Sequence, residues 1–292
     1  MKLCRYNEGS VGWVDGHTVY PVSGALAASG LPAHASMEET IAHLVNHPGE
    51  VAKITAHKDH GIDLSKAHLL SPLINPPAVW AAAANYKAHQ AEMIGRVGST
   101  DRSALTPDEL MAEIFLKPNS SITGPGGPVI LPKVSKHVDF ECELAAVIGK
   151  TARNVSSKDA LDYVFGYTIC WDISIRDPWG IGRQNTRNIR KGFDTFCGLG
   201  PWIVTADEIK DPHVLNINVE QNGKNVMKAN TSDMINDLRE LIRFLSSVCT
   251  LKAGTVITTG TPAGVSRLAH GDHLKGTIDG IGAMELQVIN EV

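Results

Sequence analysis

Short stretches of alternating apolar and polar residues open the chain. In VGWVDGHTVYPV, the pair Asp15-Gly16 separates two such runs, a pattern typical of a β-hairpin. Ser36 and Glu39 have the spacing of a capping box before the apolar segment IAHLV. This spacing predicts a short helix that ends near His47, where a proline and a glycine follow.

Prolines mark the end of this first part. Pro72, Pro76 and Pro77 interrupt the apolar pattern within six residues. We therefore predict a small N-terminal α/β domain over residues 1–75 and a larger domain over residues 76–292.

The larger part has mostly the short apolar runs of strands. We expect strands over 78–83, 140–149, 166–174, 255–260 and 283–292, with a hairpin turn at Asn222-Gly223. We expect helices from near Asn85, over 158–164 with Ser156 or Ser157 as the cap, and over 236–248. The fold class predicted is β-rich α+β.

A polar stretch, residues 93–114, lies between these elements. It contains three glycines or small polar residues in a row and then Thr106-Pro107-Asp108-Glu109, a capping box with proline at the first helical position. Long polar connections between core elements are often functional. A mobile lid is one interpretation, and a surface loop with a short helix is the other.

Composition narrows the classes of protein. The 292 residues carry a formal net charge of −4, so no basic excess points to nucleic acid. Five scattered cysteines form no CxxC pair and suit a cytoplasmic protein with reduced thiols. Neither a secretory signal nor a membrane-spanning apolar run is visible, so we expect no membrane association.

Two glutamates in the strand FECELAAVIG carry the first candidate chemistry. Glu141 and Glu143 are two residues apart, so in a strand their side chains point to the same face. Carboxylates in apolar surroundings repel each other unless they are paired or bound to a metal, and oxygen ligands suit Mg²⁺ or Mn²⁺. A sheet surface with two solvated glutamates is the alternative.

Asp172 lies in a second apolar strand, YTICWDIS, and is a candidate third ligand. A buried aspartate needs a partner. The nearby Arg176 offers an ion pair with Asp172 as the competing explanation.

His89 and Glu92 lie three residues apart and share one face of a helical turn. A carboxylate that holds one imidazole nitrogen leaves the other free to take a proton from water, although a plain surface pair has the same spacing. Lys191 precedes a glycine, a placement that fits either a site ammonium or a basic turn. The segment TTGTPAGV (258–265) is either an anion-holding loop or only a turn.

Taken in order, these segments resemble the fumarylacetoacetate hydrolase family. NYKAHQAEM, FLKPNSSITGPGGPVILP, VDFECELAAVIGK, GYTICWDISIRD, KGFDTFCGLGPWI and TTGTPAGV are similar to family motifs at consistent order and spacing. The resemblance runs from about residue 78 to the C-terminus. It implies a layered β-roll, usually a homodimer, that uses Mg²⁺ to act on small oxo acids.

The resemblance also implies roles residue by residue. It implies Glu141, Glu143 and Asp172 as metal ligands, and His89, Glu92 and Lys191 as catalytic groups. It implies substrate contacts for Arg176, Thr261 and Tyr86.

The sequence departs from the family pattern at two tryptophans. Trp171 stands where asparagine usually precedes the metal-binding aspartate, and Asp177-Pro178-Trp179 replaces a segment that ends in glutamine. We expect these tryptophans to make the pocket narrower or more apolar, which bears on the substrate rather than on the metal ligands.

The function that these expectations favour is metal-dependent hydrolysis of a C–C bond in an acylpyruvate-like diketo acid. Decarboxylation or keto–enol isomerisation of an oxaloacetate-like acid at the same site is the alternative within enzymes. A non-catalytic oxo-acid-binding protein is the alternative from another class, and nucleotide binding through residues 258–265 lacks the phosphate-loop pattern.

Overall fold

Strand pairing organises the protein. The computed structural model describes residues 1–26, 30, 32, 34–97, 101–177 and 187–292. The first strands are β1 (Lys2–Tyr6), β2 (Ser10–Asp15), β3 (Thr18–Pro21), β4 (Ile62–Asp63), β5 (Leu69–Leu70), β6 (Val79–Ala81), β7 (Phe115–Lys117), β8 (Ile122–Thr123), β9 (Pro128–Leu131) and β10 (Val138–Asp139). They are followed by β11 (Cys142–Ile148), β12 (Val164–Asp172), β13 (Ser174–Ile175), β14 (Cys197–Thr205), β15 (Asn216–Gln221), β16 (Lys224–Asn230), β17 (Val256–Thr258), β18 (His273–Ile278) and β19 (Gly282–Asn290).

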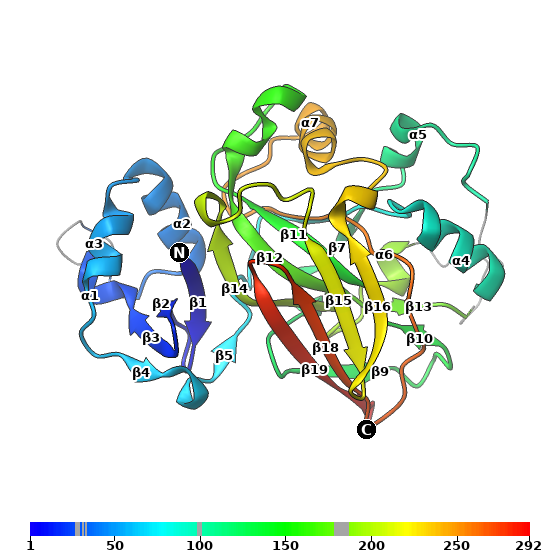
Figure 1. The fold of residues 1–292 in the computed structure, drawn as a ribbon, viewed down its shortest axis with the longest axis horizontal. Helices are drawn as coiled ribbons and strands as arrows, with labels where there is room; N and C mark the ends of the chain where they lie inside the picture. Colours follow the sequence, from blue (N-terminus) through cyan, green and yellow to red (C-terminus); the bar gives the residue numbers. More distant parts are fainter. Residues whose placement is uncertain (27–29, 31, 33, 98–100, 178–186) are drawn as a thin grey trace.

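The α-helices lie around the sheets (Figure 1). They are α1 (Val22–Leu26), α2 (Met37–Asn46), α3 (Glu50–Ala56), α4 (Lys87–Val97), α5 (Pro107–Met111), α6 (Arg187–Arg190) and α7 (Leu238–Val248). Among the described residues, no helix has both the length and the apolar content needed to cross a membrane.

One large sheet runs through the molecule in the order β4-β3-β2-β1-β14-β12-β11-β17-β6-β7, with β5 paired to β1 and β8 to β14. Its central strand β11 is buried along its whole length and pairs antiparallel with β12. A run of small and branched apolar residues suits this position, because both faces of the strand are covered.

A second sheet packs against the first. Its order is β16-β15-β18-β19-β9, and Figure 1 shows its yellow and red strands across the green strands β11 and β12. The layers meet closely: a Cβ atom on Gly276 of β18 would lie 2.7 Å from Trp171 Cζ2 and 2.7 Å from Cys142 Sγ. Glycine is needed at this position because the Trp171 ring occupies that space. The expected β-rich, layered α+β fold is confirmed.

The predicted capping box and the two predicted hairpins are present in the structure. Ser36 accepts from the Glu39 amide and the Glu39 carboxylate accepts from the Ser36 amide, which completes the predicted capping box of α2. The hairpins at Asp15-Gly16 and Asn222-Gly223 are both present. In the second, both turn residues have positive φ, as a tight two-residue hairpin requires.

The helix predicted over 158–164 is different in kind. Residues Ser157–Tyr163 form a 3-10 helix, and Ser156 makes no side-chain cap to its backbone. The Ser156 hydroxyl instead donates to the Asp159 carboxylate at 2.6 Å. The predicted side-chain cap at Ser156 was therefore wrong, because the Ser156 hydroxyl bonds to the Asp159 carboxylate instead of to the backbone of the helix.

The N-terminal segment continues the large sheet. Strand β1 pairs antiparallel with β14, at the boundary between the blue and green regions of Figure 1. Leu3 and Ile41 from this segment share an apolar core with Ala145 and Leu199. The division of the chain near residue 75, like the closing of a lid over residues 93–114, stays a prediction, and residues 98–100 lie outside the described part.

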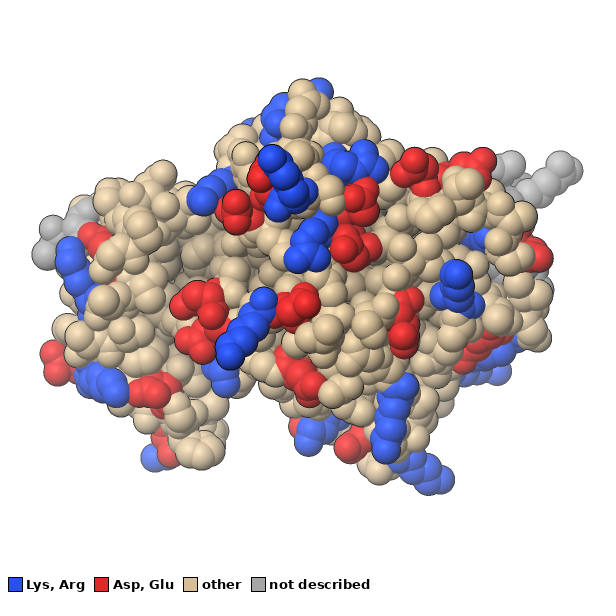
Figure 2. All heavy atoms as spheres, turned by 45° about the horizontal axis from the view of Figure 1, so that its top comes forward, with Lys and Arg blue, Asp and Glu red and all other residues tan. Residues whose placement is uncertain are grey.

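Acidic and basic side chains are interspersed over the face shown in Figure 2. This face has no broad area of one sign, so it offers little long-range attraction for an anion.

The capping box of α2 supports a stability prediction. Replacing Ser36→Ala removes the acceptor for the Glu39 amide, so the free energy of unfolding should fall by about 1 kcal/mol. Urea denaturation measures this change. The exposed Ser10 provides the control, because Ser10→Ala should change the free energy by less than about 0.5 kcal/mol. Equal effects of the two substitutions would contradict the capping role.

Candidate metal centre and active site

Three carboxylates come together where β11 and β12 pair. Glu141 directly precedes β11, Glu143 lies on it, and Asp172 ends β12. The Asp172 amide donates to the Glu141 carbonyl at 2.8 Å, so the strand register sets these two residues opposite each other. One oxygen from each carboxylate lies within 4.8 Å of the others, and all three residues are buried. The sequence prediction that these residues share one site is therefore matched by their placement.

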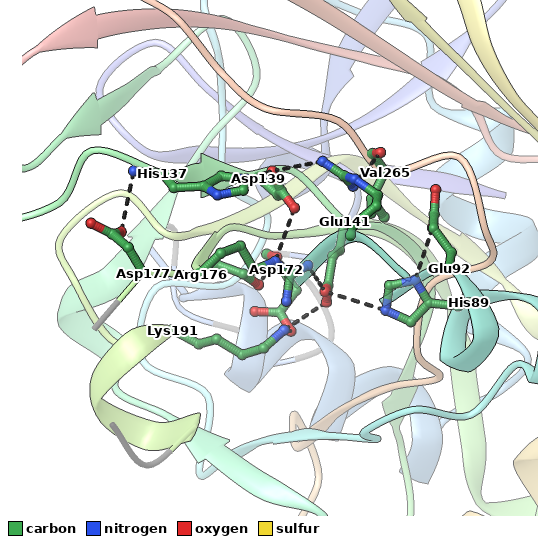
Figure 3. A network of polar contacts seen from close by, with 12 residues as sticks. His89, Glu92, His137, Asp139, Glu141, Asp172, Arg176, Asp177, Lys191 and Val265 are labelled. Carbon is green, nitrogen blue, oxygen red and sulfur yellow. Dashed lines mark hydrogen bonds and ion pairs between the residues drawn. The ribbon is translucent and has the colours of Figure 1, made fainter. Parts of the chain in front are cut away.

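Two lysines neutralise part of this negative charge. The Lys191 ammonium donates to Glu141 Oε2 and to Asp172 Oδ2, each at 2.6 Å. The Lys117 ammonium is fully buried and donates to Asp172 Oδ1 at 2.6 Å. Figure 3 shows Lys191 reaching toward Glu141 and Asp172. The structure thus places Lys191 beside the carboxylates rather than on a surface turn.

Arg176 has other partners than the one considered from the sequence. Its Nε atom lies 3.0 Å from Asp139 Oδ2, and its terminal nitrogen donates to Glu141. The competing explanation, an Asp172–Arg176 ion pair, is therefore wrong. The physical reason is that Lys117 and Lys191 already occupy both oxygens of Asp172.

The two glutamates differ in their proton affinity. Burial favours the neutral form of Glu141, but the charges of Lys191 and Arg176 outweigh it and hold its pKa well below the usual range. Burial and the charges of Asp172 and Glu141 raise the pKa of Glu143 well above the usual range. The charge of Lys191 lowers the pKa of Glu143 but does not outweigh these effects, so Glu143 is less compensated than Glu141.

The residues present fit a divalent cation. Glu143 Oε1 is buried and makes no hydrogen bond of ordinary geometry with the described residues, although the Thr258 hydroxyl is close enough to lower the pKa of Glu143. A hard cation with a preference for oxygen, such as Mg²⁺ or Mn²⁺, would bond to this oxygen and relieve the repulsion among the carboxylates. Glu141, Glu143 and Asp172 are the residues that would hold it.

His89 lies between two carboxylates (Figure 3). Its Nδ1 atom is 3.4 Å from Glu92 Oε2, and its Nε2 atom is 3.6 Å from Glu141 Oε1. Burial lowers the pKa of His89, but the contacts with Glu141 and Glu92 outweigh burial and raise it. The predicted His89–Glu92 pair is therefore an inward-facing pair, not a surface pair, and it adjoins the carboxylates.

The loop that follows β17 holds carboxylates of the protein itself. The Gly260 amide donates to Glu143 Oε2 at 2.8 Å, and the Gly264 amide donates to both oxygens of Glu92, at 3.1 and 3.2 Å. Both glycines have positive φ, where a side chain would be strained. The segment 258–265 is therefore more than a turn, and its amides orient a candidate ligand and a candidate catalytic residue.

A cavity of about 280 Å³ opens onto this network. Its walls include five residues expected at the site, namely His89, Glu141, Arg176, Lys191 and Thr261. The Thr261 hydroxyl donates to the Cys142 carbonyl at 3.1 Å, which fixes its orientation at the wall.

Tyr86 is placed differently. It is buried and lines a neighbouring cavity of about 1020 Å³. The two cavities share Gln90 and Arg102 in their walls, so they adjoin each other.

Trp171 does not narrow this cavity. It is fully buried, and its ring stacks edge-on against Phe140 with centroids 5.7 Å apart. Because Asp172 points toward the site, its neighbour in the strand must point to the opposite face, into the core between the sheets. The expectation of a pocket shaped by Trp171 was wrong, and Trp179 lies outside the described residues.

Sequence reasoning missed several charged residues of the network. Lys117, Asp139 and Arg190 were given no role, although Lys117 stands in the FLKP motif that carried part of the resemblance. Asp139 is fully buried and pairs with Arg176 and with Arg96. A charged residue inside an otherwise apolar strand was the available signal for Lys117 and Asp139.

Comparison with known proteins agrees with this geometry. The family model of the fumarylacetoacetate (FAA) hydrolase C-terminal domain matches residues 78–289. The chain belongs to the fumarylacetoacetate hydrolase family.

Individual relatives extend the match to the whole chain. Maleylpyruvate hydrolase of Aquipseudomonas alcaligenes is 40% identical over 292 residues, which cover 99% of each chain. The mitochondrial oxaloacetate tautomerase of Xenopus laevis is 39% identical over 79% of this chain and 71% of its own. The crystal structure of maleylpyruvate hydrolase from Sphingobium sp. SYK-6 with manganese (II) ion and pyruvate is 33% identical, covers 100% of both chains and superposes with a TM-score of 0.82.

The incompletely compensated charge of Glu143 gives a two-sided prediction. Glu143→Gln should make the metal-free protein more stable, by roughly 1–2 kcal/mol, because it removes a buried acidic group that the nearby cations do not fully offset. The same change should weaken Mn²⁺ binding at least about 10-fold, because it removes a charged ligand. Urea denaturation without metal and calorimetric Mn²⁺ titration measure the two effects.

The exposed Glu8 is the matched control for this substitution, and Glu8→Gln should change neither quantity. A metal-free Glu143→Gln variant that is less stable than the wild type, with unchanged Mn²⁺ affinity, would contradict the electrostatic account.

The core position of Trp171 gives a prediction that separates packing from specificity. Trp171→Phe should lower the free energy of unfolding by about 1–3 kcal/mol, since the ring fills the space between the sheets. The ratio of kcat/KM for two oxo acids should stay within about 2-fold of the wild-type ratio. Denaturation and steady-state kinetics test this, and a changed ratio at unchanged stability would show that the ring acts on the substrate.

Proposed function

We propose that the protein is a divalent-metal-dependent hydrolase that cleaves a C–C bond of a small, acylpyruvate-like oxo acid. One observation carries this proposal: a buried triad of carboxylates lies beside the His89–Glu92 pair, and both adjoin one small cavity. The carboxylates suit Mg²⁺ or Mn²⁺, and the imidazole suits a general base. The similarity to maleylpyruvate hydrolases, one of them described with manganese (II) and pyruvate, supports it.

A bound divalent ion supplies positive charge that polarises the carbonyl of a 2-oxo acid and stabilises negative charge that develops on it. Holding this ion is the role proposed for Glu141, Glu143 and Asp172.

The imidazole of His89 is oriented to take a proton from water. Nδ1 faces the Glu92 carboxylate, so in the neutral imidazole the proton on Nδ1 bonds to Glu92 and Nε2 is the acceptor. The carboxylate of Glu141 raises the pKa of His89, and a divalent cation held by Glu141 would offset that charge and favour the neutral form. Two hydrogen bonds from the Gly264 amide fix Glu92 in turn. We propose that Nε2 removes a proton from water as the water oxygen bonds to the distal carbonyl carbon.

The C–C bond then breaks, and its electron pair stays with the pyruvate portion as an enolate. The protonated His89 returns its proton to the enolate carbon, so the products are a carboxylic acid and pyruvate. Lys191, a cation of the cavity wall that contacts two carboxylates of the triad, is proposed to stabilise the oxyanion that forms when water adds.

Substrate contacts are proposed for Arg176 and Thr261, which line the same cavity. Tyr86 would contact only a substrate that extends into the neighbouring cavity.

Tautomerisation or decarboxylation of an oxaloacetate-like acid is the second candidate at the same site. The similarity to an oxaloacetate tautomerase favours keeping it. A panel assay separates the activities: an acylpyruvate loses its diketone absorbance on hydrolysis, whereas oxaloacetate releases CO₂ or changes its enol content. Binding of oxo acids without turnover of any of them would favour a non-catalytic binding protein.

We also propose a homodimer in the cytoplasm. The family resemblance supports the dimer. All five cysteines are free thiols, and four of them are buried, which suits a reducing compartment. Sedimentation equilibrium tests the dimer by giving twice the mass of the chain.

The role of His89 gives a kinetic prediction. His89→Asn should lower kcat for acylpyruvate hydrolysis by roughly 10²–10⁴-fold, because the general base is lost. Mn²⁺ affinity should change little, since His89 is not among the three carboxylates. The exposed His68 is the control, and His68→Asn should keep wild-type kcat. A His89→Asn variant with kcat within about 2-fold of the wild type would remove His89 from the mechanism.

A further inference from the structure

Several cations line the site cavity. Arg102, Arg187 and Arg190 line it together with the two cations already described, Arg176 and Lys191. Among the described residues of its wall, Glu141 is the single carboxylate. The cavity is therefore positive away from the metal triad, which is unusual on a chain whose net charge is −4.

Most of these cations already have an acidic partner. Glu113 lies 2.5 Å from Arg102 Nε and 2.5 Å from Arg187 Nη2, so one carboxylate serves two guanidinium groups. Arg176 and Lys191 are paired with Glu141 and its neighbours. These pairs also fix the side chains that surround Arg190.

Arg190 is the exception. It has no ion pair with any carboxylate in the described part of the chain, and its Nε atom is buried without a hydrogen-bond partner there. None of the remaining residues (27–29, 31, 33, 98–100 and 178–186) is Asp or Glu, so none of them can supply the carboxylate.

The surroundings of Arg190 are unfavourable for its charge. Burial, followed by the positive charges of Arg176 and Arg187, lowers the pKa of Arg190. A half-buried guanidinium among like charges is stabilised by an anion that brings two acceptor oxygens.

We propose that Arg190 binds a second, distal carboxylate of the substrate, so that the enzyme selects dianionic oxo acids over acylpyruvates with an uncharged acyl end. This inference rests on the proposed function, because it assumes that the oxo-acid end of the substrate lies at the metal triad. The planar guanidinium of Arg190 matches a carboxylate with two parallel hydrogen bonds, and Arg187 and Arg102 add positive potential. Arg190 is thus a specificity-determining residue.

Two unreactive ligands of equal length isolate this contact. 2-Oxoglutarate ends in a carboxylate and 2-oxopentanoate ends in a methyl group, while both have the same oxo-acid end. Calorimetry on the Mn²⁺-loaded protein should show tighter binding of 2-oxoglutarate by roughly 10–100-fold. Arg190→Gln should remove this preference and leave the affinity for 2-oxopentanoate unchanged. Arg190→Lys should keep part of the preference, because lysine keeps the positive charge but cannot form the two parallel hydrogen bonds of a guanidinium.

Arg239, which lies outside this cavity and pairs with Asp237, provides the control, and Arg239→Gln should keep the full preference. Thermal melting checks that Arg190→Gln is folded, which is expected since no ion pair is lost. Two wild-type results, no preference for 2-oxoglutarate or binding of neither ligand, would overturn the proposal. A preference that survives in Arg190→Gln would overturn it too.

Turnover of maleylpyruvate and acetylpyruvate by the same variants separates this proposal from the proposed function. The wild type could cleave neither acid and still prefer 2-oxoglutarate through Arg190. That result would support the carboxylate site and overturn the proposed hydrolase function. Arg190→Gln should lower kcat/KM for maleylpyruvate roughly 10–100-fold, mainly through KM, and leave kcat/KM for acetylpyruvate unchanged. That result would support both the carboxylate site and the hydrolase function.

Discussion

The mutual repulsion of three buried carboxylates is the constraint on which the site depends. The side chains of Glu141, Glu143 and Asp172 are buried. Like charges interact strongly there, because the effective dielectric constant is lower than in water. Lys117 and Lys191 offset Asp172 and part of Glu141, but the charge of Lys191 does not fully offset Glu143. A divalent cation completes this balance, so metal binding and the stability of the site are two aspects of the same electrostatic requirement.

The strands that carry these carboxylates point alternate side chains toward the site and toward the core between the sheets. On β12, Asp172 points toward the site while Trp171 fills the space between the two sheets. Rigid packing on one face holds the carboxylates in position on the other, and the amides of Gly260 and Gly264 orient Glu143 and Glu92. The cations that line the cavity with Arg190 give its wall a charge opposite to that of the triad.

Sequence reasoning worked where the deciding interaction is local. The capping box at Ser36 and the turn at Asn222-Gly223 depend on neighbours within three residues, and the strand period gave the common face of Glu141 and Glu143. The same period already contradicts a pocket-lining role for Trp171, since adjacent strand residues point apart. The charge of Lys117 within an apolar strand was a signal, but its partner could not be predicted, because Asp172 is 55 residues away and the contact depends on the position of β7. Arg190 is significant because no described carboxylate forms an ion pair with it, and only the surrounding structure reveals this.

The account is tested most directly by locating the ion. Crystals soaked in Mn²⁺ and measured at a wavelength sensitive to manganese give an anomalous difference map that shows the metal independently of the protein atoms. The account predicts one strong peak bonded to an oxygen from each of Glu141, Glu143 and Asp172, on the side that faces His89. A map without a peak at the triad, or with manganese held by other residues, would contradict it.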